Sequence, residues 1–314
     1  MAKLKRSRWE NRVILQGGLG NQLFQYAFAH FLAIQTNSKI NLENRIIVYK
    51  TGHDSRFFLD YYEKQCTHLE FKKNIVINCN NTIGKFIYKI GMADYLEKFF
   101  LAFSNYKTIL EKDFDYRKLP NNFNKGVKIS FDGFWQNWYY VDYVKNQLIV
   151  ELLKIVETVE FSRCFSLENE KKYLIIHVRR GDYNLPKNKR SFGVLDLSSY
   201  LPKITELRNR NPLLEILTVT DDPNLLENES LVLHFGRIIG PQCLDSWQVL
   251  KLMSKADYLM TANSSLSWWG GYLCMHNGGY EFIPKPWFKV NSNDLTDAVS
   301  HPKFSTYPSI FDEN

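Results

Sequence analysis

Short apolar runs alternate along most of the chain with longer segments whose apolar residues have helical spacing. The apolar run at residues 13–16 predicts a buried strand, and a glycine-rich loop separates it from apolar residues spaced for a helix at 23–32. The same order recurs later, with a predicted amphipathic helix at 245–255 and a tryptophan-rich helix that opens near Leu266. Strands that alternate with helices favour an α/β fold with largely parallel sheets. The predicted strands are residues 13–16, 173–178, 215–220, 258–261 and 281–283.

The chain is long enough for two domains of ordinary size, since it has 314 residues. A charged segment at about 150–170 has a mostly helical pattern, and we place the domain boundary there, which gives domains at 1–160 and 161–314. The polar and glycine-bearing motifs follow the carboxyl ends of predicted strands, where open α/β sheets bind their ligands.

Composition and charge narrow the class of partner. Hydrophobic residues make up 45% and charged residues 23%, which is typical of a soluble globular protein. The formal net charge of +7 favours an anionic partner, such as a nucleotide, a phospholipid surface or a nucleic acid. No sustained basic run is interleaved with aromatic residues, so we expect no nucleic-acid partner. A weak attraction to anionic membrane lipid stays open.

The cysteines and the apolar stretches together indicate a reducing, cytoplasmic location. The five cysteines are odd in number and widely spaced, with no CxxC pair and no Cys/His cluster, which argues against structural zinc and against a disulfide framework. The longest apolar stretch, 27–34, is too short to span a bilayer, and no signal peptide is evident. We therefore expect the protein in the cytoplasm.

The glycine-rich loop at 17–21 suits close approach of a ligand. Its three glycines let the backbone come near, and the following helix offers free N–H groups and the positive end of its dipole. Leu23 stands where the third glycine of GxGxxG belongs, so the loop argues against an NAD-dependent oxidoreductase. The loop is consistent with a polar or phosphorylated ligand, and equally with a tight structural turn.

The segment 177–183, His-Val-Arg-Arg-Gly-Asp-Tyr, ends a predicted strand. If Val178 faces the core, His177 and Arg179 face the opposite side, and Arg180 enters the loop. Arginine suits a diphosphate because its planar fork donates two hydrogen bonds and keeps its charge. The alternative is an ion pair with Asp182, and we favour a ligand role for at least one arginine. The adhesion tripeptide at 180–182 is set aside, because no export signal is evident.

Two further polar pairs also follow predicted strands. Asp221 and Asp222 can bind a metal, accept hydrogen bonds from a base or a ribose, or cap the next helix. Ser264 and Ser265 precede a helix, where they can bind phosphate or serve only as an N-cap.

The segment 134–137 mixes aromatic surface with amide groups in a predicted loop. Trp135 and Gln136 suit a sugar, because sugar rings stack on aromatic faces and amides bond hydroxyl groups. A packed hairpin is the alternative. We expect Trp268 and Trp269 in the core instead.

Together these motifs resemble glycosyltransferase family eleven, the galactoside α-1,2-fucosyltransferases. The matches run in order from residue 13 to residue 288, which is nearly the whole chain, and five in sequence are specific. Phe134, Thr220 and Leu266 depart mildly from the usual pattern. The matching motifs are the glycine-rich signature at 17–27, Phe-Trp-Gln at 134–136, His-Val-Arg-Arg-Gly-Asp-Tyr at 177–183, the serine–tryptophan motif at 263–269 and Pro-Lys-Pro-Trp-Phe at 284–288.

The resemblance implies a GT-B architecture, in which two Rossmann-like domains face a central cleft. The N-terminal domain would present the acceptor and the C-terminal domain would hold GDP-fucose. The implied reaction inverts GDP-β-L-fucose to an α-1,2-fucoside of a terminal β-galactose, with no cofactor and no obligatory metal. A protein cation must then stabilise the departing diphosphate. We expect Arg180 in that role, with Arg179 or His177 assisting.

The resemblance also implies roles for the other motif residues. The serine pair would hold phosphate oxygens, the aspartate pair would contact the nucleoside, and Asn21 would lie near the fucose or the diphosphate. Asp182 is the nearest acid in a motif, but it can also serve only to orient an arginine, so the general base is unassigned. The candidates are Arg180, Asn21 and Asp182 for catalysis, Gly18, Gly20, His177, Arg179, Arg180, Asp221, Asp222, Ser264 and Ser265 for the donor, and Trp135 and Gln136 on the acceptor side.

Two rival functions stay open at this stage. One is another GDP-sugar transferase, such as a peptide O-fucosyltransferase, and the other is a non-catalytic glycan-binding protein. The lack of an N-terminal anchor favours a bacterial type of enzyme. Such an enzyme would modify a lipid-linked oligosaccharide in peripheral contact with the inner membrane face.

Overall fold

The chain folds into two compact units, Met1–Leu148 and Ile149–Asn314, called unit 1 and unit 2 below. The division falls within helix α4 (Trp138–Thr158), whereas the sequence placed the boundary after residue 160. In this computed structural model the described residues are 11–44, 47–48, 59, 69–72, 77–78, 106–113, 128–168, 170–290 and 297–312.

Unit 1 is built on a parallel sheet with helix α1 packed against it. Its elements are β1 (Asn11–Leu15), α1 (Leu19–Thr36), β2 (Ile40–Asn44), β3 (Ile47–Val48), β4 (Leu69–Lys72), β5 (Ile77–Asn78), β6 (Tyr106–Leu110), the 3-10 turn η1 (Glu111–Asp113), β7 (Lys128–Asp132) and α4. Among the described residues the strand order is β4-β2-β1-β7-β6, all parallel, and β3 pairs separately with β5.

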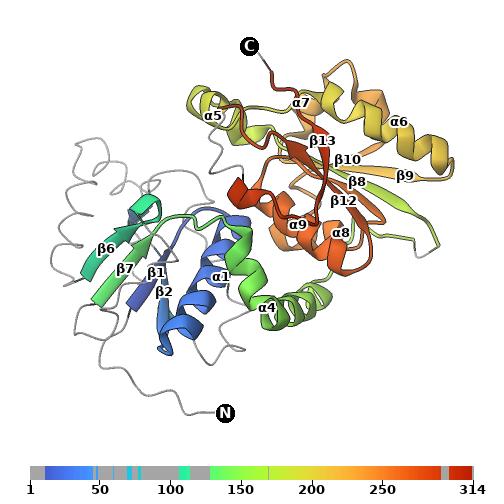
Figure 1. The fold of residues 1–314 in the computed structure, drawn as a ribbon. Helices are drawn as coiled ribbons and strands as arrows, with labels where there is room; N and C mark the ends of the chain where they lie inside the picture. The colour runs from blue at the N-terminus through green and yellow to red at the C-terminus, as the bar shows by residue number, and fades with distance from the viewer. Residues whose placement is uncertain are drawn as a thin grey trace. The chain divides into compact units, whose positions relative to one another are not determined.

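Apolar positions at helical spacing hold α1 in place. The residues that the sequence assigned to the buried face of this helix, between Leu23 and Leu32, are all buried. Phe28 meets Phe131 of β7 edge-on, with ring centroids 5.6 Å apart, and Phe31 lies 5.0 Å from Tyr140 of α4. The helix therefore joins the sheet to the first turn of α4, as Figure 1 shows.

Unit 2 is a second parallel sheet with helices on both faces. Its elements are β8 (Tyr173–Val178), η3 (Gly181–Asn184), α5 (Pro186–Ser191), η4 (Leu197–Ser199), α6 (Leu201–Arg210), β9 (Glu215–Thr220), α7 (Pro223–Glu227), η5 (Val232–Phe235), β10 (Arg237–Ile239), α8 (Ser246–Ser254), β11 (Tyr258–Met260), α9 (Ser265–His276), β12 (Tyr280–Lys285) and β13 (Ser305–Pro308). The strand order in the described part is β10-β9-β8-β11-β12-β13.

Side chains of β8 point alternately to the two faces of the sheet and meet different partners there. Leu174, Ile176 and Val178 join a core that contains residues of α6, while the intervening His177 bonds to Ser267 of α9. Figure 1 shows α6 on one side of this sheet and the adjacent helices α8 and α9 on the other. Val178 therefore faces the core, and the consequence expected for that case, His177 on the opposite face, is confirmed.

Long apolar segments also match their prediction. Strands β8 and β9 have the predicted bounds, and the indoles of Trp268 and Trp269 are fully buried in the core. In the parts of the chain that the structure describes, no helix combines the length and the apolar character needed to cross a membrane.

Candidate active site

Each unit has a point at which the order of its strands reverses. In unit 2 the chain places β9 on one side of β8 and β11 on the other, and in unit 1 it places β2 and β7 on opposite sides of β1. Open parallel sheets bind ligands outside the carboxyl ends of their strands at such a reversal. The loops that follow β8 and β11, and those that follow β1 and β7, carry most of the predicted motif residues.

Asp221 holds the loop after β8. Its Oδ1 accepts hydrogen bonds from the backbone N–H groups of Arg180 at 2.8 Å and Gly181 at 3.2 Å. Any side chain at Gly181 would begin 2.4 Å from Asp221 Oδ2, so this approach requires glycine. Asp221 therefore shapes the arginine loop, whereas the family resemblance implied that the aspartate pair contacts the nucleoside.

Arg179 is the arginine that this loop presents. Its Nη1 lies 3.0 Å from Asp221 Oδ2 and its Nη2 lies 2.6 Å from Asp182 Oδ1, while its Nε is buried without a hydrogen-bond partner. The side chain is 25% exposed. Burial alone would lower the pKa of Arg179, but Asp221 and Asp182 outweigh it, so the pKa is raised. The guanidinium is charged, held in one orientation and partly open to solvent.

Arg180 is used differently from what the sequence predicted. Its guanidinium is almost fully buried, with Nε 2.8 Å from Glu229 Oε1 and Nη1 donating to the Leu195 carbonyl at 2.9 Å. Burial alone would lower its pKa, but Glu229 outweighs it and the pKa is raised. These partners occupy the group inside the protein, so the geometry argues against Arg180 as the cation for a departing diphosphate.

His177 links the end of β8 to helix α9 and, through it, to the loop after β11. Its Nδ1 shares a hydrogen bond with Ser267 Oγ, which also accepts from the backbone N–H of Ala262 at 3.0 Å. Burial, followed by the positive charge of Arg179, lowers the pKa of His177 to about 4. The ring is therefore neutral near pH 7 and adds no positive charge for a diphosphate.

Lowering the pH from 6.5 to about 4.5 is expected to reduce the free energy of unfolding by about 2 kcal/mol through His177 alone. In the unfolded chain this histidine takes up a proton near pH 6.5, whereas in the folded state its pKa is about 4. The unfolded state therefore binds more protons in this window, and stability falls as the pH falls. His177→Gln should lose this part of the pH dependence, measured by urea unfolding at both pH values.

The exposed His234 gives the matched control for that measurement. His234→Gln should show the same difference in free energy of unfolding between the two pH values as the wild-type protein. An equal difference in wild type and His177→Gln would contradict the assignment.

The loop after β11 meets the loop after β8. The Tyr183 hydroxyl donates to the Asn263 carbonyl at 2.9 Å, and the Asn263 side chain donates to the Phe192 carbonyl at 3.0 Å. Ser264 is the N-cap of α9 but makes no side-chain capping bond, and Ser265 is the first residue of the helix. The serine hydroxyls and the free N–H groups of this first turn can bind phosphate oxygens.

Asp222 takes the capping role that the sequence left open. Its Oδ1 accepts from the backbone N–H of Leu225 at 3.1 Å, at the start of α7.

In unit 1 the glycine loop lies against the loop after β7. The Gln136 side chain donates to Asn21 Oδ1 at 2.7 Å, so the structure brings these two predicted residues together. Gly18 is the N-cap of α1, and Gly20 lies in its first turn. Gly17 has φ of 73°, and a side chain there would begin 2.3 Å from Asn21 Nδ2, which explains the glycine.

Trp135 lies in the core of unit 1. Its ring stacks on Phe28 with centroids 3.9 Å apart and only 1% of the residue is exposed, so it presents no face to a sugar in this structure. Its positive φ of 56° turns the chain, and the preceding Phe134 is 43% exposed. Phe134 is therefore the aromatic surface of this loop, which corrects the role given to Trp135.

Glu111 is a site residue that sequence reasoning missed. Its Oε2 accepts from the backbone N–H of Phe134 at 2.8 Å and so holds the loop after β7. Burial raises its pKa, although hydrogen bonds from backbone N–H groups of this loop act in the opposite direction. No motif surrounds Glu111, and the sequence between it and β7 offers no signal of the pairing.

Together the loops of unit 2 can bind a diphosphate. They combine one oriented arginine, two serines at a helix N-terminus and backbone N–H groups at the carboxyl edge of a parallel sheet. The residues that the structure describes contain no group of three or more His, Cys, Asp or Glu placed to hold a metal ion.

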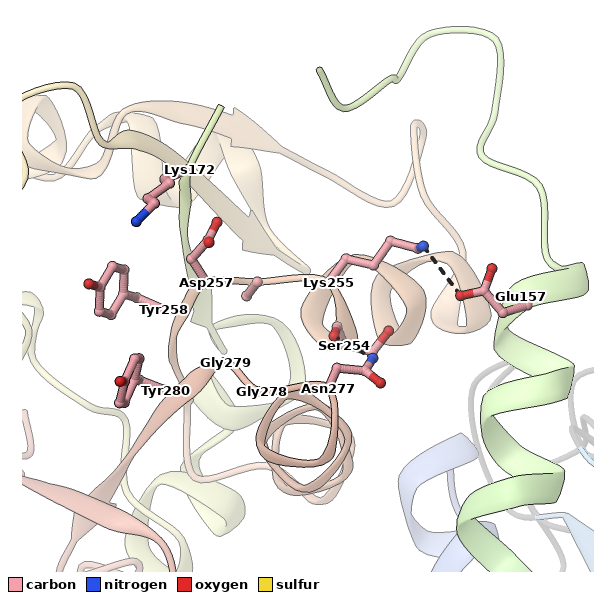
Figure 2. Close-up of a pocket in the computed structure, with 11 residues that line it drawn as sticks. Glu157, Lys172, Ser254, Lys255, Asp257, Tyr258, Asn277, Gly278, Gly279 and Tyr280 are labelled. Carbon is pink, nitrogen blue, oxygen red and sulfur yellow. Dashed lines mark hydrogen bonds and ion pairs between the residues drawn. The ribbon is translucent and has the colours of Figure 1, made fainter. Parts of the chain in front are cut away.

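A hollow of about 580 Å³ lies at the opposite edge of the unit 2 sheet (Figure 2). It is lined by Lys172 just before β8, and by Tyr258 and Tyr280 at the starts of β11 and β12. Tyr258 and Tyr280 stack on each other, and Lys255 forms an ion pair with Glu157 at 3.3 Å. Because the strands are parallel, this amino edge is separate from the loops of the candidate site.

Comparison with solved structures shows the fold. The crystal structure of a family 9 glycosyl transferase from Veillonella parvula matches with a TM-score of 0.50 and 9% identity, over 100% of this chain and 90% of that one. With two parallel-sheet α/β units, the chain has the GT-B type of fold that the sequence predicted. The cleft expected between the units stays a prediction.

Comparison of sequences identifies the family. An Escherichia coli alpha-1,2-colitosyltransferase is 32% identical over 296 residues, covering 89% of this chain and 94% of that protein. The E. coli O-antigen biosynthesis glycosyltransferase WbnK is 26% identical over 303 residues, covering 88% of this chain and 95% of that protein. The profile of glycosyl transferase family 11 matches residues 11–298. The chain therefore belongs to glycosyl transferase family 11 and is a glycosyltransferase.

Proposed function

We propose that the protein transfers L-fucose from GDP-β-L-fucose to the 2-hydroxyl of a terminal β-galactose, with inversion and without an obligatory metal ion. The observation that carries the proposal is the oriented guanidinium of Arg179 at the strand reversal of unit 2. Family membership supplies the reaction class, because a glycosyl transferase of this family uses an activated sugar donor. The α-1,2 linkage is supported by the name of the relative that is 32% identical.

We assign the leaving-group cation to Arg179. A sugar nucleotide that loses its diphosphate develops negative charge on the phosphate oxygens, and a fixed cation stabilises that charge in the transition state. Asp221 and Asp182 hold the guanidinium at 3.0 and 2.6 Å, and the side chain is still 25% exposed, so its charge can act on a bound diphosphate. In this scheme Asp182 is a positioning residue.

Ser264 and Ser265 complete the phosphate site in this proposal. Ser264 makes no capping bond to its own helix, so its hydroxyl is free of that competing role. The strand β11 that leads into this loop pairs with β8, which leads into the Arg179 loop. Both groups therefore approach one diphosphate from neighbouring strands.

On the acceptor side we propose the pair of Asn21 and Gln136 with the exposed ring of Phe134. Amide groups bond sugar hydroxyls, and an exposed phenyl face covers the apolar side of a pyranose. The name of WbnK supports an O-antigen oligosaccharide as the acceptor class. A net charge of +7 would favour a lipid-linked form of it at an anionic membrane face.

The name of the colitosyltransferase relative favours a second donor. Colitose is fucose without its 3-hydroxyl group, so both sugars are compatible with one phosphate site. A pocket that hydrogen-bonds this hydroxyl would reject the deoxy sugar by a factor on the order of ten thousand. A pocket without such a bond would accept both sugars at similar rates.

The test is release of GDP from GDP-fucose and from GDP-colitose, in EDTA, with and without a panel of β-galactosides. We expect acceptor-dependent release from GDP-fucose and a new α-1,2 linkage by NMR. Release only from GDP-colitose would mean that the donor sugar is colitose and not fucose, while the proposed phosphate site and acceptor would stand. If the protein binds GDP but releases none from either donor with any of the galactosides, the assignment of β-galactose as the acceptor would be overturned. A requirement for Mg²⁺ or Mn²⁺ would overturn the metal-independent scheme.

A further inference from the structure

Two cysteines far apart in the chain lie side by side in unit 2. Cys164 follows the end of α4, and Cys243 lies in the loop between β10 and α8, 79 residues later. Their Sγ atoms are 2.8 Å apart. A disulfide needs its sulfurs at about 2.05 Å, so only a small approach separates these thiols from a bond.

The surroundings of the pair hold both segments together. The Ser162 hydroxyl lies 3.0 Å from Cys164 Sγ and donates to the Cys243 carbonyl. Arg237 donates to the Cys164 carbonyl at 3.3 Å and lies over the ring of Phe165. Hydrogen bonds therefore hold the backbone of both cysteines, and the guanidinium of Arg237 lies beside the pair.

The pair differs from the other described cysteine. Cys164 is exposed and Cys243 is partly buried, so a small molecule can reach the first sulfur. Cys274 is fully buried, its thiol donates to the Ala256 carbonyl, and burial raises its pKa to about 12. Reactivity of a thiol follows its exposure and its thiolate fraction, so Cys274 is inert by comparison.

We propose that Cys164 and Cys243 are a thiol modification site that reacts with low-molecular-weight disulfides of the glutathione type and closes to an internal disulfide. The Cys164 thiolate attacks the external disulfide, forms a mixed disulfide and expels one thiolate. The Cys243 thiolate then attacks Cys164 Sγ, forms the Cys164–Cys243 bond and expels the second thiolate. Two protein thiols are oxidised, one external disulfide is reduced to two thiols, and the two protein protons end on those products.

The two thiols suit different steps of this exchange. The hydrogen-bond contact with Cys243, and then that with Ser162, lowers the pKa of Cys164, while the same cysteine contact raises the pKa of Cys243. The exposed sulfur is thus the better thiolate and the attacking one. The second sulfur lies 2.8 Å from the first and resolves the adduct, and this proximity favours an internal bond over a stable mixed disulfide.

The bond would lock a contact that is now non-covalent. Lys251 and Gln248 of α8 donate to the carbonyls of Val159 and Glu160, at 2.5 and 2.7 Å. Lys255 of α8 pairs with Glu157, as Figure 2 shows. The disulfide would close a loop of roughly 80 residues that contains β8, β9 and β10, so it should stabilise unit 2. The expected rise in melting temperature is about 5 °C.

The test treats the full chain with glutathione disulfide, without denaturant, and maps the products by peptide mass spectrometry. We expect a Cys164–Cys243 linked peptide, a loss of two hydrogen atoms, reversal by dithiothreitol and an unmodified Cys274. Cys243→Ser should accumulate a stable glutathione adduct on Cys164, because the resolving thiol is missing. Cys164→Ser should react at least tenfold more slowly at Cys243.

Three results would overturn the proposal. They are a stable glutathione adduct on Cys164 in the wild-type protein without a bridge, a bridge from either cysteine to Cys66 or Cys79, and equal adduct formation in the two serine variants. A melting temperature that is the same for the bridged and reduced proteins would overturn the stabilising effect. Each serine variant loses only one hydrogen-bonding sulfur, so we expect it to fold. The melting temperature of each variant checks this.

Discussion

Replacing Arg179 by alanine is expected to lower kcat/KM for the sugar nucleotide by about a thousandfold, or about 4 kcal/mol of transition-state stabilisation. Arg179 is the charged group that the loop after β8 holds in place and leaves partly exposed, between Asp221 and Asp182. Its loss removes the positive side chain that would stabilise the departing diphosphate. The measurement is steady-state GDP release at saturating acceptor, together with GDP binding by calorimetry.

The fold should survive this substitution. Asp221 would keep its bonds from the backbone N–H groups of Arg180 and Gly181, so the loop would still be anchored. We expect a melting temperature within a few degrees of wild type. Arg179→Lys is the matched variant, since it keeps the charge but loses the planar fork, and its kcat/KM should lie between those of wild type and alanine.

A smaller loss would contradict the assignment. If Arg179→Ala keeps more than about a tenth of the wild-type kcat/KM, the missing interaction is worth less than about 1.4 kcal/mol and the leaving-group cation must be another group. Loss of GDP binding with an unfolded protein would instead point to a structural role. Circular dichroism of the same samples separates these two cases.

The sequence was a good guide to the elements because their signals are local. A run of apolar residues between Tyr173 and Val178 specifies β8, and strand geometry puts His177 on the face opposite Val178 once Val178 is in the core. Helix α1 was visible because its apolar residues repeat at helical spacing, although the folded helix is buried at every position from Gln22 to Ala33. Motifs at the ends of these strands then follow from the topology of parallel sheets.

The sequence failed where the deciding partner lies far along the chain. Arg179 and Arg180 are adjacent, and either one suits a diphosphate by chemistry alone. Arg180 is held inside the protein by Glu229, 49 residues further along the chain, and no residue near the motif indicates this pairing. Likewise Trp135 is turned inward by a positive φ, and Cys243 meets a cysteine 79 residues away. Such pairings depend on the fold and not on local pattern.

Replacing Arg180 by alanine is expected to lower the free energy of unfolding by about 3 kcal/mol. Glu229 would keep its charge with no arginine beside it, and the Leu195 carbonyl would lose its donor. The Glu229 side chain is 32% exposed, so water limits the penalty to the lower end of the range for buried pairs. Urea unfolding measures the loss, and Arg208→Ala, at an exposed position of α6, is the control with the same change in charge.

The pairing itself is separated from these side effects by a double-mutant cycle with Glu229→Gln. Each single variant should be destabilised, while the double variant should lose clearly less than the sum, because the second change removes the charge that the first leaves unpaired. At a temperature where all variants are folded, Arg180→Ala should keep far more kcat/KM than Arg179→Ala. If Arg180→Ala is folded and as inactive as Arg179→Ala, the leaving-group role returns to Arg180. If the losses in unfolding free energy are additive in the cycle, the Arg180–Glu229 pair does not stabilise the fold.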